Sequence, residues 1–202
     1  MAKRESTFKN MVLSLTIIAT LFALCLGLIH ELTAAPIAQA QLNKKTAAIS
    51  EVVPPFDNDP NAEMYTQTTP EGDYNLEIYP AKKDGQIVGY AVNTLTMKGF
   101  NGEIDLMVGF KPNGEIYKVY VLNHSETPGL GAKMTTPEFR DQFEGKNPST
   151  FKLQVKKDGG DIDAITAATI SSRAFADAVQ RAYDTLFADK ELNAVSGETS
   201  VQ

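Results

Sequence analysis

The sequence predicts an α+β protein, in which an antiparallel sheet with packed helices follows one N-terminal transmembrane helix. Residues 10–29 carry no charge, and residues 62–122 alternate short β-branched or aromatic runs with tight turns. Further on, residues 175–187 carry one apolar stripe at helical spacing. Closely spaced strands with short connections favour antiparallel pairing, and the helical segments are expected to pack on the sheet.

The uncharged run is long enough to cross a membrane. A helix over residues 10–30 would span roughly 30 Å, which matches the thickness of a bilayer's hydrocarbon core. Membrane lipid would then surround this segment. Lys3, Arg4 and Lys9 precede the run, whereas His30 and Glu31 follow it. Positive charge before the span predicts that residues 1–9 are a cytoplasmic basic start and that the rest of the chain lies on the far side.

A cleaved signal peptide is the alternative for this segment. Ala38 and Ala40 form a small-x-small pattern that resembles a cleavage site. A signal peptide's apolar region is usually about 7–15 residues long, however, and this run is longer. The length favours a retained single-pass anchor.

The composition excludes several classes of site. One Cys among 202 residues excludes an internal disulfide framework and any Cys-built cluster, and two His leave little room for a histidine-built metal centre. We therefore expect no metal site. A formal net charge of −6 argues against a nucleic-acid partner, which would usually meet a basic face.

The elements of the exported part are predicted in chain order. Residues 31–55 are expected to form a helical stalk that is broken near Pro36 and ends at Pro54 and Pro55. A domain over residues 56–189 follows. Its predicted turns lie at residues 83–86 and 111–114, and its predicted strands are residues 87–96, 104–110 and 115–122.

The last third of the chain mixes helices with one short strand. Thr136 and Pro137 predict a helix start, and that helix should run to about Glu144. Residues 151–155 are expected to be a strand. A final helix should begin near residues 169–172, and residues 190–202 are expected to be a flexible tail that frays from Asp189.

Two segments stand apart as candidate sites. Residues 124–133 follow a strand and include Pro-Gly-Leu-Gly, which gives a bare backbone that could approach a flat or anionic ligand. Residues 161–173 are small, hydroxyl-rich and lie where a helix begins, which favours an anion such as phosphate. Each also has a plain structural interpretation, as a strand-to-helix turn and as an N-cap at Thr169 or Ser171.

Taken together, these segments resemble the G subunit of the Rnf electron-transport complex. The likeness rests on Glu-Thr-Pro-Gly-Leu-Gly at residues 126–131 and on Asp163 followed by Thr-Ala-Ala-Thr at residues 166–169. More distantly, the chain resembles the C subunit of the sodium-translocating NADH:quinone oxidoreductase. Both families carry an FMN-binding domain on one transmembrane anchor. The family pattern is Asp-x-x-(Ser/Thr)-Gly-Ala-Thr, and Ala167 stands where it usually has Gly.

The resemblance implies a covalent cofactor. It implies FMN joined by a phosphoester to Thr169, with Glu126, Thr127, Leu130 and Ser171 as further cofactor-binding residues. A separate flavin transferase would make the bond and would recognise Asp163, Thr166 and Ala168.

The resemblance also implies a function and a location. The chain would relay electrons between ferredoxin and NAD within an Rnf-type complex that moves ions across the inner membrane, with other Rnf subunits as partners and its FMN domain outside the cytoplasm. It would not be catalytic alone. Two alternatives are an anchored assembly or binding module without a cofactor, and an FMN relay of a different membrane electron-transfer system.

Overall fold

The computed structural model describes residues 7–196, and for residues 188–196 it describes the helical backbone alone. The chain divides into two compact units, residues 1–43 and 44–202, which are described separately. The basic residues Lys3 and Arg4, and the end of the expected tail at residues 197–202, lie outside the described residues.

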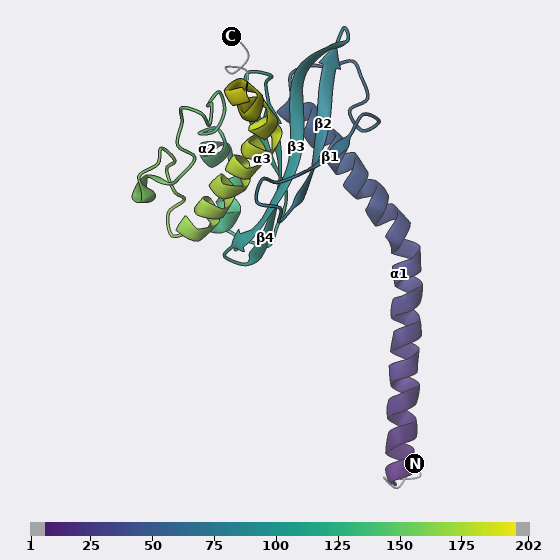
Figure 1. The fold of residues 1–202 in the computed structure, drawn as a ribbon. Coiled ribbons are helices and arrows are strands. Elements are labelled where there is room, and N and C mark those ends of the chain that lie inside the picture. Colours follow the sequence, from purple (N-terminus) through teal and green to yellow (C-terminus); the bar gives the residue numbers. More distant parts are fainter. Residues whose placement is uncertain (1–6, 197–202) are drawn as a thin grey trace, which may run out of the picture. The chain divides into compact units, whose positions relative to one another are not determined.

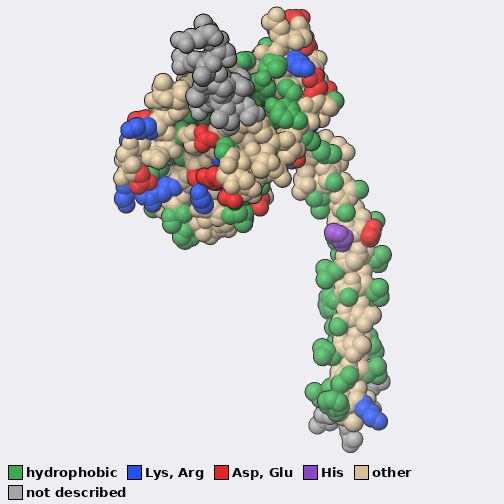
Figure 2. All heavy atoms as spheres, viewed as in Figure 1, with side chains coloured by type: hydrophobic (Ala, Val, Ile, Leu, Met, Phe, Trp, Pro, Cys, Tyr) green, Lys and Arg blue, Asp and Glu red, His purple; other side chains and the backbone are tan. Residues whose placement is uncertain are grey.

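One long helix, α1, spans Phe8–Val52 (Figure 1). Within the described part of the chain it is the one helix long and apolar enough to cross a membrane. Hydrophobic side chains are exposed along most of its length (Figure 2). The expected break near Pro36 is wrong, because Pro36 lies inside the continuous helix. A proline removes only one main-chain donor from the ladder, so a helix can continue past it at some cost.

Within residues 7–196, five strands form one antiparallel sheet in the order β1-β2-β3-β4-β5, which confirms the predicted fold class. The strands are β1 Tyr65–Thr68, β2 Asn75–Lys83, β3 Gln86–Gly99, β4 Gly102–Phe110 and β5 Ile116–His124. Asp84 and Gly85 join β2 to β3, both with positive φ (50° and 76°), as a two-residue type I′ hairpin requires.

The helical elements follow the sheet in the sequence. They are η1 Gly131–Thr135, α2 Pro137–Arg140, η2 Lys156–Asp158 and α3 Thr169–Ser196. The expected helix to Glu144 is wrong in length, because α2 ends at Arg140 and continues as turns. The expected start of the last helix is confirmed, and its backbone remains helical past Asp189 to Ser196.

The strand expected at residues 151–155 is wrong. Only an isolated parallel bridge between Val155 and Ile162 forms there. The Lys152 N–H donates to the Asp161 carboxylate at 2.9 Å, and the Gln154 N–H donates to the Lys152 carbonyl at 2.7 Å. Local partners satisfy this backbone, so it has no need of a neighbouring strand.

Each face of the sheet carries its own apolar core. On one face, α3 packs over β3 and β4 (Figure 1), and side chains such as Val92, Leu106 and Phe175 are fully buried. On the other, the last turns of α1 bring Ile49 and Val52 against the sheet. Packing against β3 and β4 therefore fixes the position of α3 in the domain.

Candidate functional site

A cavity of about 310 Å³ opens at the N-terminus of α3. Three segments meet there: the turn between β3 and β4, the loop after β5, and the chain leading into α3. The lining residues are Phe100, Glu126, Thr127, Leu130, Gly131, Ala167, Ala168, Thr169, Ile170 and Ser171. The volume lies at the lower end of the range for small-molecule sites in proteins.

A buried carboxylate ties these three segments together. Glu126 is 5% exposed, and its Oε1 accepts a hydrogen bond from the backbone N–H of Asn101 at 3.1 Å. Its Oε2 accepts a hydrogen bond from the Ser171 hydroxyl at 2.7 Å, and Ser171 is 1% exposed. Buried carboxylates are stable only when hydrogen-bonded, so these two donors hold the floor of the cavity in one arrangement.

Two glycines make room for that carboxylate. A Cβ on Gly131 would lie 2.4 Å from Glu126 Oε2 and 2.5 Å from Ser171 Oγ, and a Cβ on Gly99 would lie 2.7 Å from Glu126 Oε1. The second glycine of the Pro-Gly-Leu-Gly run is therefore required by close packing. The first, Gly129, has φ of 78° and supplies the turn itself.

A tight turn leads into α3. The Ala168 N–H donates to the Ile165 carbonyl at 2.9 Å, which closes a four-residue turn. Ala167 holds the third position with φ of 61°, as a type II turn requires. Ser172 reinforces the turn, since its hydroxyl accepts a hydrogen bond from the Ile165 N–H at 2.9 Å and donates to the Ala168 carbonyl at 3.0 Å.

Thr169 is the first residue of α3 and is half-buried in the cavity wall. The first N–H groups of a helix have no partner within that helix, and the helix dipole places partial positive charge at the same end. An anionic group on Thr169 would therefore lie beside backbone donors and a favourable field.

Asp163 and Thr166 lie outside the cavity. Both are exposed, and Asp163 Oδ2 forms an ion pair with Lys156 Nζ at 2.7 Å. Gln142 holds the backbone of Asp163 from both sides. Its Oε1 accepts from the Asp163 N–H at 2.7 Å, and its Nε2 donates to the Asp163 carbonyl at 3.2 Å. This side of the segment is open to a macromolecule approaching from solvent.

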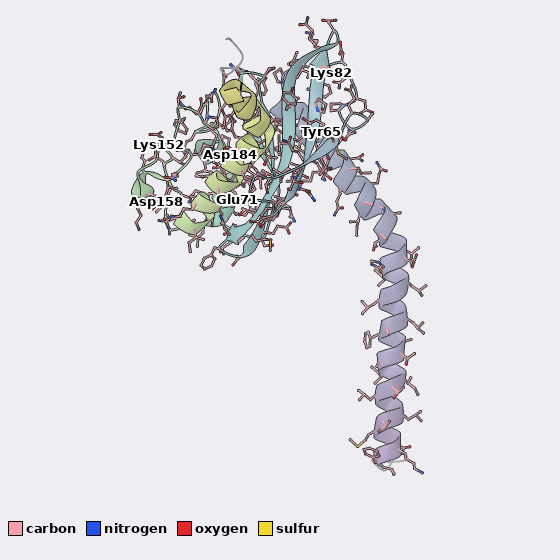
Figure 3. The ribbon with its side chains drawn as sticks, viewed as in Figure 1. Tyr65, Glu71, Lys82, Lys152, Asp158 and Asp184 are labelled. Carbon is pink, nitrogen blue, oxygen red and sulfur yellow. The ribbon has the colours of Figure 1, made fainter. Side chains whose placement is uncertain are left out.

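A second ion pair fixes the first turns of α3 from outside. Arg173 donates to both carboxylate oxygens of Asp158 at 2.6 and 2.7 Å, and Figure 3 labels Asp158 in the loop region beside α3. The Arg173 guanidinium holds the pKa of the Asp158 carboxyl below its ordinary value. Such planar two-point pairing restrains η2 against the helix start.

The structure brings together six of the eight predicted site residues. These are Glu126, Thr127, Leu130, Ala168, Thr169 and Ser171, and all of them line the cavity. Sequence reasoning missed three residues at or around the site: Phe100, Asn101 and Gln142. The run Gly-Phe-Asn-Gly at residues 99–102 is typical of a hairpin turn. Nothing in the neighbouring sequence indicates that this turn contacts a loop 25 residues away.

The residues present fit a flat cofactor that carries a phosphate. Phe100, Leu130 and Ile170 are 66%, 42% and 47% exposed and surround the opening with apolar surface. Hydroxyl groups and a helix N-terminus lie beside them. Apolar contact for a ring system and donors for an anion are what such a ligand needs.

Comparison with known proteins agrees with this geometry. Residues 99–184 match the FMN-binding domain family, a stretch that contains the whole cavity lining. The fold, the cavity, this match and the apolar helix α1 define a class: a single-pass membrane protein with an FMN-binding domain.

Longer matches narrow the class to a family. The G subunit of the ion-translocating oxidoreductase complex of Shewanella piezotolerans is 34% identical, over 86% of this chain and 89% of that protein. The G subunit of the Na(+)-translocating ferredoxin:NAD(+) oxidoreductase complex of Acetobacterium woodii is 34% identical, over 80% and 83%. This chain belongs to the family of G subunits of ion-translocating oxidoreductase complexes. The chain is also similar to the crystal structure of Shewanella oneidensis NqrC, with 22% identity and a TM-score of 0.47 over 67% of this chain and 75% of that one.

Proposed function

We propose that this chain is the membrane-anchored flavoprotein subunit of an Rnf-type complex, with FMN bound covalently through a phosphoester to Thr169 Oγ. Its domain lies on the extracytoplasmic side and relays electrons in ferredoxin/NAD electron transfer that is coupled to ion translocation. The family membership supports the complex and its other subunits as partners. The match to the FMN-binding domain family supports the cofactor.

The position of Thr169 carries the covalent part of the proposal. Thr169 is the first residue of a 28-residue helix and lines a cavity with an apolar rim. A phosphodiester keeps one negative charge, and that charge at a helix N-terminus is stabilised by about 0.3–1 kcal/mol. The first-turn backbone N–H groups would hold the phosphate, because the Ser171 hydroxyl already donates to Glu126 Oε2 and supports the site from below.

The protein's own groups bind and orient, and FMN supplies the one- and two-electron redox chemistry. Leu130 and Thr127 would contact the ring system from the loop after β5. Glu126 holds that loop against α3, which keeps the two binding segments in register. A bond to Thr169 prevents loss of the cofactor by dilution outside the cytoplasm.

Attachment requires a flavin transferase as a second partner. That enzyme would transfer the FMN moiety of FAD to the Thr169 hydroxyl, with AMP as the other product. The exposed Asp163 and Thr166 support recognition from solvent, and Ala168 supports the turn that presents Thr169.

The first experiment tests attachment. The full chain, produced with a flavin transferase, should fluoresce under ultraviolet light in a denaturing gel, and its intact mass should exceed that of the polypeptide by one FMN moiety. Thr169→Ala should abolish both signals, and Thr135→Ala, at an exposed threonine outside the cavity, should leave both unchanged. A fluorescent Thr169→Ala chain would refute the attachment site.

The second experiment tests orientation and lipid contact. The native Cys25 lies inside the apolar run, so a second cysteine can report topology. In intact spheroplasts an impermeant maleimide should label Glu144→Cys, at an exposed position of the domain, and should not label Thr7→Cys before the span. The reverse pattern would refute the extracytoplasmic location, and a chain released by carbonate washing would refute the anchor.

Ala167 supports one alternative, a cofactor-free assembly module. Its positive φ disfavours every residue with a Cβ, and this strain lies within the segment that the transferase would read. An intact mass equal to the bare polypeptide, in cells that contain the transferase, would favour this alternative. Recovery of flavin with partners other than Rnf subunits would instead favour a different electron-transfer system.

A further inference from the structure

The side chain of Phe100 is left in solvent at the tip of the turn between β3 and β4. It is 66% exposed, although full burial of a phenylalanine side chain is worth about 1.5–3 kcal/mol. It lines the same cavity as Thr169. A large aromatic side chain at such a place has apolar surface available for a ligand.

The turn that carries Phe100 is held in place. The Asn101 N–H donates to Glu126 Oε1 at 3.1 Å, and Asn101 Nδ2 donates to the Ser125 carbonyl at 2.9 Å and to Thr127 Oγ1 at 3.2 Å. Gly99 packs so closely that a Cβ there would lie 2.3 Å from the Gly102 carbonyl oxygen. Three hydrogen bonds and one close backbone approach therefore fix this wall of the cavity.

The other apolar residues of the rim come from different segments. Leu130 belongs to the loop after β5, and Ile170 belongs to the first turn of α3. Both are nearly half exposed and line the cavity with Phe100. Apolar side chains that converge from three segments on one opening form a surface suited to a flat apolar ligand.

We propose that Phe100 contacts the isoalloxazine ring of the FMN carried by Thr169 and forms the wall of the site on the side of the β3–β4 turn. This inference rests on the proposed function. Aromatic side chains stabilise ring contacts in stacked or edge-to-face geometry. Because the tether at Thr169 and the ring of Phe100 share one cavity, the flavin is favoured as the occupant over a surface of another protein in the complex.

A tyrosine at this position provides a direct test of contact. An excited flavin takes an electron from a touching tyrosine and returns to the ground state without emission, whereas phenylalanine is a poor donor. In the folded full chain, Phe100→Tyr should lower flavin fluorescence severalfold relative to wild type. The matched control is Ile87→Tyr, at an exposed position near the opposite end of β3, which should leave the fluorescence unchanged.

The same samples, once denatured, report the amount of flavin attached. Equal fluorescence after denaturation, with a loss only in the folded Phe100→Tyr chain, supports the contact. Undiminished fluorescence of the folded, flavin-bearing Phe100→Tyr chain overturns it and leaves the proposed function intact. A wild-type chain without flavin overturns both.

Two further variants measure shielding of the ring. Iodide quenching of the folded chain should rise severalfold in Phe100→Ala, because one wall is removed. It should rise less in Asn101→Ala, because the turn loses two of its hydrogen bonds but keeps the phenyl ring. Quenching equal to wild type in Phe100→Ala overturns the proposal.

Discussion

The carboxylate of Glu126 accepts a hydrogen bond of 2.7 Å from the hydroxyl of Ser171, across 45 residues of sequence and with both residues buried. This contact joins the loop after β5 to the first turn of α3. The segment that would contact a ring and the segment that would hold a phosphate are thereby fixed relative to each other. A site for a ligand with two such parts depends on that constraint.

The first prediction concerns this pair. Ser171→Ala should lower the free energy of unfolding by about 1–3 kcal/mol, because a buried carboxylate oxygen loses its donor. Glu126→Gln should cost less, since the amide can donate to Ser171 Oγ and still accept from the Asn101 N–H. Denaturant titration of the full chain in detergent measures both, with the exposed Ser149→Ala as the control. Equal losses in all three variants would contradict the role of this hydrogen bond.

The second prediction concerns Ala167, which has φ of 61° in the turn before Thr169. A left-handed conformation costs a residue with a Cβ about 1–2 kcal/mol, and glycine avoids this cost. The greater entropy of glycine in the unfolded chain offsets about 0.4–1 kcal/mol of that gain. Ala167→Gly should therefore raise the free energy of unfolding by up to about 1.6 kcal/mol. It should also speed flavin attachment by relaxing the turn.

Two measurements check the Ala167 prediction. Denaturant titration gives the stability, and in-gel flavin fluorescence over time gives the rate of attachment. Ala168→Gly is the matched control, because Ala168 has no positive φ and should lose stability on substitution. A loss of stability in Ala167→Gly as well would contradict the strain at this turn.

Local patterns were enough to predict most of the fold. Strands β3, β4 and β5, the hairpin at Asp84 and Gly85, and the start of α3 each follow from nearby residues. The strand expected at residues 151–155 failed because Asp161 satisfies the Lys152 N–H from outside the segment. Its apolar run could not show that partner.

The candidate site was predictable only where its residues lie in short motifs. Thr169 and Leu130 lie in short motifs, whereas Phe100 and Asn101 enter the site through contacts with a segment 25 residues away. The sequence predicted Gly131 as part of a bare-backbone loop. The structure shows why a glycine is needed there: the Glu126 carboxylate occupies the space that a side chain would fill. Packing between distant segments leaves no periodic mark in the sequence.

The third prediction concerns the contact of α1 with the sheet. A Cβ on Gly109 of β4 would lie 1.5 Å from the Val52 carbonyl oxygen, so Gly109→Ala must displace the end of α1. Overpacking of this kind costs about 1–3 kcal/mol. Gly89→Ala should cost less, since its Cβ would lie 3.0 Å from the Phe110 carbonyl oxygen. Thermal melts measure both losses, and a lower melting temperature for Gly89→Ala than for Gly109→Ala would contradict this prediction.

The last prediction concerns Asp105 of β4, a half-buried carboxylate on the same face as the end of α1. Burial raises the pKa of Asp105, and Glu103 and Glu77 raise it further, while the Asn93 hydrogen bond of 2.6 Å and Lys45 lower it. With the folded-state pKa above the ordinary value of 3.8, the folded chain binds more protons than the unfolded chain between those two values. Stability therefore falls as pH rises through that interval and stays lower at neutral pH.

The variant Asp105→Asn tests this pH dependence. It should be more stable than wild type at neutral pH and should lose this advantage below the ordinary pKa of the carboxyl group. Glu103→Gln, at an exposed position, should show little change in stability. Denaturant titrations across pH decide the matter, because an Asp105→Asn chain less stable than wild type at neutral pH would mean that the Asn93 hydrogen bond and the charge of Lys45 outweigh burial.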